Sequence, residues 1–275
     1  MYKKYLIVAS KQDLAGVNII NQLSQYRENP LLSSMKDGPN FDFYLVDGGI
    51  LYNNVLDMER INKYDFIIFA SKHSSEKKTK TLSIHAPGNW KEAKFGGQEG
   101  KVSRVSAVFM KQIFEKLNKE KQEHQLNKYE VTMEVTHHGP LINKPCLFIE
   151  IGSTPTEWKD RRAGFVIAKT ILEAIKEFKF NPYNEVAIGI GGPHYCPNFN
   201  KIQLRSNVAI SHVIPKYVSP ITEEMIREAI EKTEEEVDFA VIDWKGLGKA
   251  EERKNVLKIL DKLYIDYKKV SEIRK

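Results

Sequence analysis

The sequence predicts an α/β fold, a single layered domain over residues 1–275 in which helices flank a mixed, largely parallel sheet. Short apolar runs alternate with longer helical stretches along the chain, which is typical of βαβ units. Gly and Pro residues fall in short clusters between these elements, and no Pro/Ser-rich linker or internal repeat divides the chain. A hydrophobic content of 41% is enough for a sizeable core.

Strands are predicted where apolar residues run for a few positions between turn residues. The predicted strands cover residues 5–10, 41–46, 65–70, 82–85, 129–135, 146–151, 186–190, 208–214 and 239–242. The turn Asp37-Gly38-Pro39 precedes the second of these strands. Residues 129–135 alternate between polar and apolar side chains, which predicts an edge or half-exposed strand.

Helices are predicted from apolar residues that recur at spacings of three and four. Asp13 is a candidate N-cap for the first helix, whose apolar residues are Leu14, Val17, Ile20 and Leu23. The other predicted helices cover about residues 102–125, 159–178, 223–235 and 249–263.

Composition limits the possible locations and partners. The chain has 42 Lys and Arg against 36 Asp and Glu, a net charge of +6 that permits a polyanionic partner without requiring one. The apolar runs are far shorter than the roughly 18 residues of a transmembrane helix, so we expect no membrane partner. The first apolar run fits a buried strand better than a secretory signal. Two cysteines are too few for a disulfide framework, which suits a reducing, cytoplasmic location.

The histidines are concentrated in the middle of the chain. All seven lie between His73 and His212, and five sit in or beside loops that contain Gly or Pro: His85, His137, His138, His194 and His212. His85 ends a predicted strand, where either a catalytic side chain or an ordinary turn residue is expected. His137 and His138 are adjacent, so the two-residue period of a strand predicts that at most one of them faces a given site.

Two segments contain residues that suggest a functional site. In the Gly191-Gly192-Pro193-His194-Tyr195-Cys196 loop, His194 and Cys196 could both bind zinc, or Cys196 could be packed and His194 act as a proton carrier. Glu150 interrupts a buried strand, so its carboxylate must be paired, hydrogen-bonded or metal-bound. Thr154 and Glu157 match a capping box at the start of a helix.

The Gly96-Gly97 turn resembles a phosphate loop, but the spacing to Lys101 fails the Walker A pattern and Val102 replaces the required Ser or Thr. A Gly-rich turn that opens the 102–125 helix could still offer N–H groups and Lys101 to a phosphate or carboxylate. The alternative is a flexible helix entry. The lysines of residues 111–128 are interspersed with Glu, which is typical of a solvated helix face.

Six segments together resemble the archaeal and plant type D-aminoacyl-tRNA deacylase family. They are His85-Ala86-Pro87-Gly88-Asn89-Trp90, Phe95-Gly96-Gly97, Thr136-His137-His138-Gly139-Pro140, Glu150-Ile151-Gly152-Ser153-Thr154, Gly191-Gly192-Pro193-His194-Tyr195-Cys196-Pro197 and Ser211-His212-Val213-Ile214-Pro215. The resemblance implies an α/β fold related to phosphorylase and peptidyl-tRNA hydrolase architectures. It also implies hydrolysis of the ester between a D-amino acid and tRNA, chiral proofreading of mischarged tRNA, and dependence on Zn²⁺.

Carried onto this chain, the resemblance suggests roles for particular residues. A zinc ion would activate water and polarise the ester carbonyl. The expected metal ligands are His85, His138, His194 and Glu150, and the expected catalytic residues are His194, His138 and Glu150. A mechanism without catalytic metal remains open, in which a His is the general base and N–H groups of the Gly-Gly-Pro turn form the oxyanion hole.

The implied partner is the acceptor end of D-aminoacyl-tRNA, a single-stranded polyanion. Lys101 with the Gly96-Gly97 turn is the predicted site for a terminal phosphate, and Trp90 or Tyr195 is predicted to stack on the terminal base. We expect a monomer that does not bind DNA.

Two other classes of function stay open. A zinc-dependent hydrolase of a small amide or ester would explain the histidine loops equally well. A non-catalytic RNA-binding protein would explain the basic charge, but no RNP-type motif is present.

Overall fold

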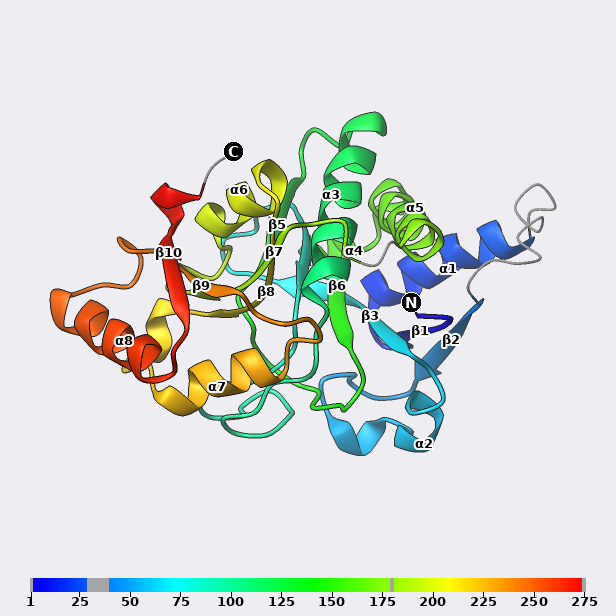
Figure 1. Ribbon diagram of the computed structural model, residues 1–275. Coiled ribbons are helices and arrows are strands. Elements are labelled where there is room, and N and C mark those ends of the chain that lie inside the picture. The colour runs from blue at the N-terminus through cyan, green and yellow to red at the C-terminus, as the bar shows by residue number, and fades with distance from the viewer. Residues whose placement is uncertain (1, 29–39, 179–180, 274–275) are drawn as a thin grey trace.

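The fold is described from a computed structural model, in which residues 2–28, 40–178 and 181–273 are placed. The predicted turn Asp37-Gly38-Pro39 lies outside these residues. Within them, the strands form two sheets connected by helices (Figure 1).

The larger sheet has six strands in the order β2-β1-β3-β6-β4-β5. The strands are β1 Lys4–Ser10, β2 Asn40–Val46, β3 Phe66–Ser74, β4 Thr81–His85, β5 Glu130–Met133 and β6 Cys146–Ser153. Strands β2, β1, β3 and β6 are parallel, β4 is antiparallel to β6, and β5 is parallel to β4. The prediction of a mixed, largely parallel sheet is confirmed, and β5 lies at an edge as its alternating sequence predicts.

A second sheet of four parallel strands has the order β10-β9-β7-β8. Its strands are β7 Glu185–Ile190, β8 Val208–Ile214, β9 Phe239–Ile242 and β10 Asp266–Lys269. The sequence analysis did not separate these strands from the first sheet and did not predict β10, whose residues are mostly charged. One apolar cluster contains side chains from both sheets. The extent of the domain, residues 1–275, stays a prediction.

The helices are α1 Leu14–Glu28, α2 Met58–Ile61, α3 Ala107–Glu123, α4 Pro155–Trp158, α5 Arg161–Glu177, α6 Pro197–Arg205, α7 Glu223–Glu231 and α8 Ala250–Lys262. The described residues also form three short 3₁₀ turns, η1 Asn53–Val55, η2 Lys216–Val218 and η3 Val270–Glu272. Helix α3 contacts α5 on the side of the larger sheet and β8 on the side of the smaller one. It therefore joins the two sheets (Figure 1).

Side-chain caps decide where two of the predicted helices begin. Ser106 accepts a hydrogen bond from the backbone N–H of Phe109, so α3 begins at residue 107 and not near residue 102. The Gly96-Gly97 turn consequently does not open this helix, which corrects the prediction. The capping box of Thr154 and Glu157 is confirmed, but it starts the single turn α4, and Asp160 caps α5 separately.

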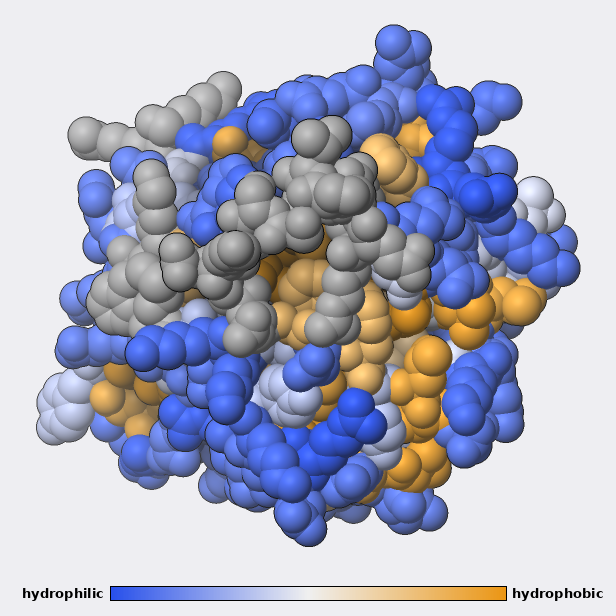
Figure 2. All heavy atoms as spheres, turned by 90° about the vertical axis from the view of Figure 1, so that its right-hand side faces the viewer, coloured by the Kyte–Doolittle hydropathy of each residue, from blue (hydrophilic) through white to orange (hydrophobic). Residues whose placement is uncertain are grey.

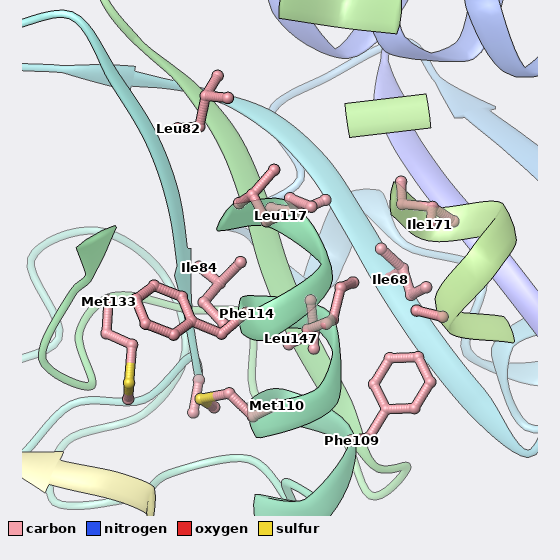
Figure 3. Packing of buried hydrophobic residues seen from close by; sticks show 14 of the residues in the cluster. Ile68, Leu82, Ile84, Phe109, Met110, Phe114, Leu117, Met133, Leu147 and Ile171 are labelled. Carbon is pink, nitrogen blue, oxygen red and sulfur yellow. The ribbon is translucent and has the colours of Figure 1, made fainter. Parts of the chain in front are cut away.

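Aromatic side chains pack between α3 and the larger sheet. Phe109 lies on α3, with its ring centroid 4.3 Å from that of Phe66 on β3 and 5.9 Å from that of Tyr5 on β1. All three are fully buried, and Figure 3 shows Phe109 beside Ile68 and Leu147 on the sheet. On β6, Ile149 and Ile151 belong to this cluster, so Glu150 between them points to the opposite face of the sheet.

Figure 2 shows an apolar patch bordered by hydrophilic residues on the side of the molecule where α1 and β2 lie. Leu45 on β2 is 39% exposed, and Leu14 at the start of α1 is 44% exposed.

We expect Phe109→Ala to destabilise the protein by about 3–5 kcal/mol, because the truncation leaves a cavity among buried rings. Tyr264→Ala is the control, since this ring is 95% exposed, and it should change the free energy of unfolding by no more than about 0.5 kcal/mol. Chemical denaturation followed by circular dichroism measures both. Equal effects of the two changes would contradict the packing described.

Candidate active site

Three neighbouring strands direct polar side chains to the face of the larger sheet opposite α3 and α5. Glu150 lies on this face of β6, together with Phe148. His85 is the last residue of β4, where it lies opposite Phe148 in the antiparallel pair with β6. The rings of His85 and Phe148 are stacked, with 5.1 Å between their centroids. On β3, Phe69 shares this face, and the two-residue period brings His73 to it as well. Strand order β3-β6-β4 therefore places both histidines beside Glu150.

The chain after β5 adds three more charged or titratable groups. Glu134 directly follows the strand, and its side chain is fully buried. The rings of His137 and His138 both lie near His85, with centroid distances of 4.1 Å and 4.8 Å. The prediction that only one of these two faces a given site is wrong. The strand has already ended at Met133, and His138 adopts a φ of 43°, so the two-residue period does not apply.

Three imidazoles are oriented by main-chain carbonyl groups. In each ring, Nδ1 lies close to a main-chain carbonyl oxygen. The distance is 3.1 Å from His85 Nδ1 to the oxygen of Ala86 and 2.8 Å from His137 Nδ1 to the oxygen of Val135. From His138 Nδ1 to the oxygen of Gly139 it is 2.7 Å. A carbonyl accepts but cannot donate, so Nδ1 carries a proton in each ring, and Nε2 is the nitrogen that can bind a metal when the ring is neutral. The ligand atoms of the three residues lie within 4.8 Å of one another. Among the described residues, Nε2 of His85 is buried without a hydrogen-bond partner. This donor set fits a metal ion.

A second group lies beside the first. Glu134 Oε1 is 3.1 Å from His73 Nδ1, and Glu134 Oε2 is 3.0 Å from His194 Nε2. Glu150 Oε2 is 3.6 Å from His73 Nδ1 and 3.7 Å from His85 Nε2, which connects the two groups. The side chain of His194 is 35% exposed, whereas those of Glu134 and Glu150 are buried. His194 is thus the part of this group that a substrate can reach.

The buried carboxylates and imidazoles shift one another's protonation. Burial alone would raise the pKa of Glu134, but hydrogen bonds from His194 and His73 hold it well below its usual range. Burial would likewise raise the pKa of Glu150, but the nearby imidazoles of His73 and His85 lower it. Burial would lower the pKa of His73, yet Glu134 and Glu150 raise it to about 11. Burial and the neighbouring His85 lower the pKa of His138 to about 4. The cluster therefore combines charged carboxylates with a neutral His138 at neutral pH.

The four residues expected as metal ligands, His85, His138, Glu150 and His194, lie in one cluster. The sequence analysis missed His73 and Glu134. Strand β3 extends past its apolar run to Ser74, and continuing the two-residue period from Phe69 could have indicated that His73 faces the same side. Glu134 falls in the alternating segment after Thr132 and gave no separate signal.

Cys196 is buried, and its Sγ lies 3.5 Å from the carbonyl oxygen of His194. Within the described ranges, none of the groups able to hold a metal contains Cys196. The alternative in which Cys196 is packed and His194 remains available for proton transfer fits the structure better than joint zinc binding.

The predicted substrate-binding residues differ in their burial and in their contacts. Trp90 is only 4% exposed and packs edge-on against His212, so its ring offers no face to a nucleotide base, which corrects its predicted stacking role. Lys101 Nζ forms an ion pair with Glu228 at 2.9 Å, so part of its charge is already matched. Tyr195 lies in the cluster, with its hydroxyl 2.9 Å from His73 Nε2.

The Gly96-Gly97 turn lies against the histidine loop. The backbone N–H of Gly139 donates to the carbonyl oxygen of Phe95 at 2.9 Å. A Cβ on Gly139 would lie 2.3 Å from both Gly97 N and Leu51 O, and both Gly96 and Gly97 have positive φ. Only glycine permits this approach, which holds the turn next to His138. The phosphate-binding role of the turn and of Lys101 stays a prediction.

Comparison with known proteins shows a consistent similarity. Residues 60–268 match the family described as D-aminoacyl-tRNA deacylase. The D-aminoacyl-tRNA deacylase of Thermococcus onnurineus is 36% identical over 95% of this chain and 98% of its own. The deacylase of Methanosarcina barkeri is 37% identical over 98% of this chain and 91% of its own. The deacylase of Methanocaldococcus jannaschii is 33% identical over 97% of this chain and 100% of its own. A crystal structure described as a conserved protein of unknown function has a TM-score of 0.85 and 30% identity, covering 98% of this chain and 96% of that one.

We expect Gly139→Ala to cost about 1–3 kcal/mol of stability, because the new methyl group meets fixed backbone atoms. Gly49→Ala is the matched control, since its Cβ would lie 3.4 Å from the Tyr52 ring, an ordinary contact, and the change should cost no more than about 0.5 kcal/mol. Urea denaturation measures both. A Gly139→Ala protein as stable as the control would show that the three loops are not packed as described.

Proposed function

Because the chain belongs to the D-aminoacyl-tRNA deacylase family, we propose that it hydrolyses the ester bond between a D-amino acid and tRNA. The products are the free D-amino acid and uncharged tRNA, so the reaction removes mischarged tRNA. The observation that carries this proposal is the combination of near full-length similarity with a partly exposed histidine beside a buried carboxylate.

His194 and Glu134 have complementary roles in this proposal. His194 faces solvent and takes the proton from the attacking water as general base. Glu134 contacts His194 Nε2 at 3.0 Å, so it orients the imidazole and stabilises the charged ring that forms. After the tetrahedral intermediate forms, the same imidazole returns the proton to the leaving ribose oxygen. Ester hydrolysis thus needs no further proton carrier.

A metal ion fits beside this pair. We assign His85, His137 and His138 as its ligands, because main-chain carbonyls hold the proton on Nδ1 of each ring and leave Nε2 as a donor. Glu150 contacts His85 and balances the charge of the group. When bound, Zn²⁺ would lower the pKa of a coordinated water toward about 7 and polarise the ester carbonyl. This proposed set differs from the one expected from the sequence, because His137 is added and His194 and Glu150 are no longer direct ligands.

The small amide or ester hydrolase is not favoured. The relatives compared above share the name D-aminoacyl-tRNA deacylase over almost the full chain. In the part of the chain that the structure describes, no helix has the length and apolar character to cross a membrane. The cytoplasmic location, the monomeric state and the lack of a DNA partner stay predictions.

We expect the protein to hydrolyse a D-aminoacyl-tRNA far faster than the matched L-aminoacyl-tRNA, since a rigid chiral pocket can reject one side-chain direction. A preference of about 10³-fold corresponds to about 4 kcal/mol of differential transition-state stabilisation. Release of radiolabelled amino acid from matched substrates measures it. Equal rates on both enantiomers would overturn the proposed function.

We expect His138→Ala to lose bound zinc and to lower kcat by at least about 10²-fold, because one of three imidazole ligands is removed. His124→Ala is the control, since this residue lies at the end of α3 and its partner is Glu120, outside the cluster. Elemental analysis of the purified proteins gives the metal content and single-turnover assays give the rates. A His138→Ala protein with unchanged zinc would rule out the assigned ligand set.

A further inference from the structure

A single-stranded RNA end presents unstacked bases, and proteins that hold such ends usually offer aromatic faces to them. Trp90 is buried and cannot serve in this way. Two other rings near the candidate active site are exposed, Phe95 at 62% and Tyr217 at 58%. Each of these two rings is therefore accessible from solvent, where a base could stack on it.

Phe95 is fixed beside the histidine cluster. Its carbonyl oxygen accepts the hydrogen bond from Gly139, the residue that follows His138. Gly96 comes next, and a Cβ there would overlap Leu51 O, so the backbone has no room to shift. The exposed ring of Phe95 is therefore carried on a turn that is hydrogen-bonded to the residue after His138.

Tyr217 lies on the segment that follows β8. The backbone N–H of Lys216 donates to the carbonyl oxygen of Gly192 at 3.1 Å, which attaches this segment to the loop that carries His194. The exposed ring of Tyr217 is therefore carried on a segment that lies beside the loop of His194.

The two aromatic segments are also joined to each other. Lys91 Nζ donates to the carbonyl oxygen of Ser219 at 2.7 Å, so the loop that leads to Phe95 is attached two residues after Tyr217. The backbone of Phe95 is thus attached to the loop of His138, and the segment of Tyr217 is attached to the loop of His194.

We propose that Phe95 and Tyr217 form a stacking site for the unpaired bases at the 3′ end of the tRNA. This inference rests on the proposed function and names the part of the protein that holds the RNA end of its substrate. Stacking needs only ring faces, so it suits a 3′ end that all tRNAs share. The competing occupant is the side chain of the ester-linked amino acid, which would make the rings part of the amino-acid pocket.

The test uses uncharged tRNA with 2-aminopurine in place of the terminal adenine, because this base loses fluorescence when it stacks. We expect the full-length wild-type protein to quench it on binding. Phe95→Leu keeps an apolar side chain but removes the aromatic face, so quenching should fall and Kd should rise by about 5- to 150-fold. Tyr217→Leu should act in the same direction. Phe95→Tyr restores a ring and should restore quenching.

Tyr264→Ala removes an exposed ring at the end of α8 and should leave quenching and Kd unchanged. Thermal unfolding of each variant checks that the fold is intact. Unchanged quenching in both Leu variants overturns the inference. So does an unchanged Kd for uncharged tRNA combined with a D/L preference that differs from wild type, because the rings then contact the amino acid. Wild-type protein that deacylates D-aminoacyl-tRNA without quenching overturns the inference alone, whereas absence of deacylation overturns the proposed function.

Discussion

The candidate active site depends on the burial of two carboxylates, Glu134 and Glu150. Each is almost fully removed from water, and an unpaired charge in such a place would be strongly destabilising. The imidazoles of His73, His85 and His194 surround them and lower the carboxyl pKa values. The positions of these histidines are therefore a condition for folding as well as for chemistry. A metal ion bound to the neighbouring imidazoles would add positive charge to the same balance.

Main-chain groups then decide what each imidazole can do. A carbonyl oxygen at Nδ1 holds the proton there and leaves Nε2 as a metal donor, as in His85, His137 and His138. His194 has a carboxylate at Nε2 and is partly exposed, which suits proton transfer. In the proposed mechanism, residues of one chemical type thus have two different roles because they have different hydrogen-bond partners.

The two sheets place these groups in one location. The larger sheet contributes its β3, β4 and β6 side chains, while the loop after β7 in the smaller sheet contributes His194. The N–H of Val135 donates to the carbonyl oxygen of His194 at 2.9 Å, which connects the segment after β5 directly to that loop. The site therefore lies where a loop of the smaller sheet meets the larger one, the kind of position in which α/β proteins bind ligands.

The sequence by itself determined most strands and helices, because apolar periodicity reports which side of an element is buried. It also indicated that Glu150 needs a partner and that the histidine loops carry the chemistry. Local patterns were insufficient where distant residues decide the outcome. Trp90 sits against His212, more than a hundred positions along the chain, and Lys101 is matched by Glu228.

Only the tertiary structure decided which histidines act together. His73 joins the site because β3 pairs with β6, and β6 pairs with β4, so residues far apart in sequence share one face. His137 and His138 both join it because the strand ends before them and His138 adopts a positive φ. Strand order and backbone conformation after a strand depend on the packing of the whole chain. A two-residue period cannot encode them, and this is why the sequence located the chemistry without assembling the site.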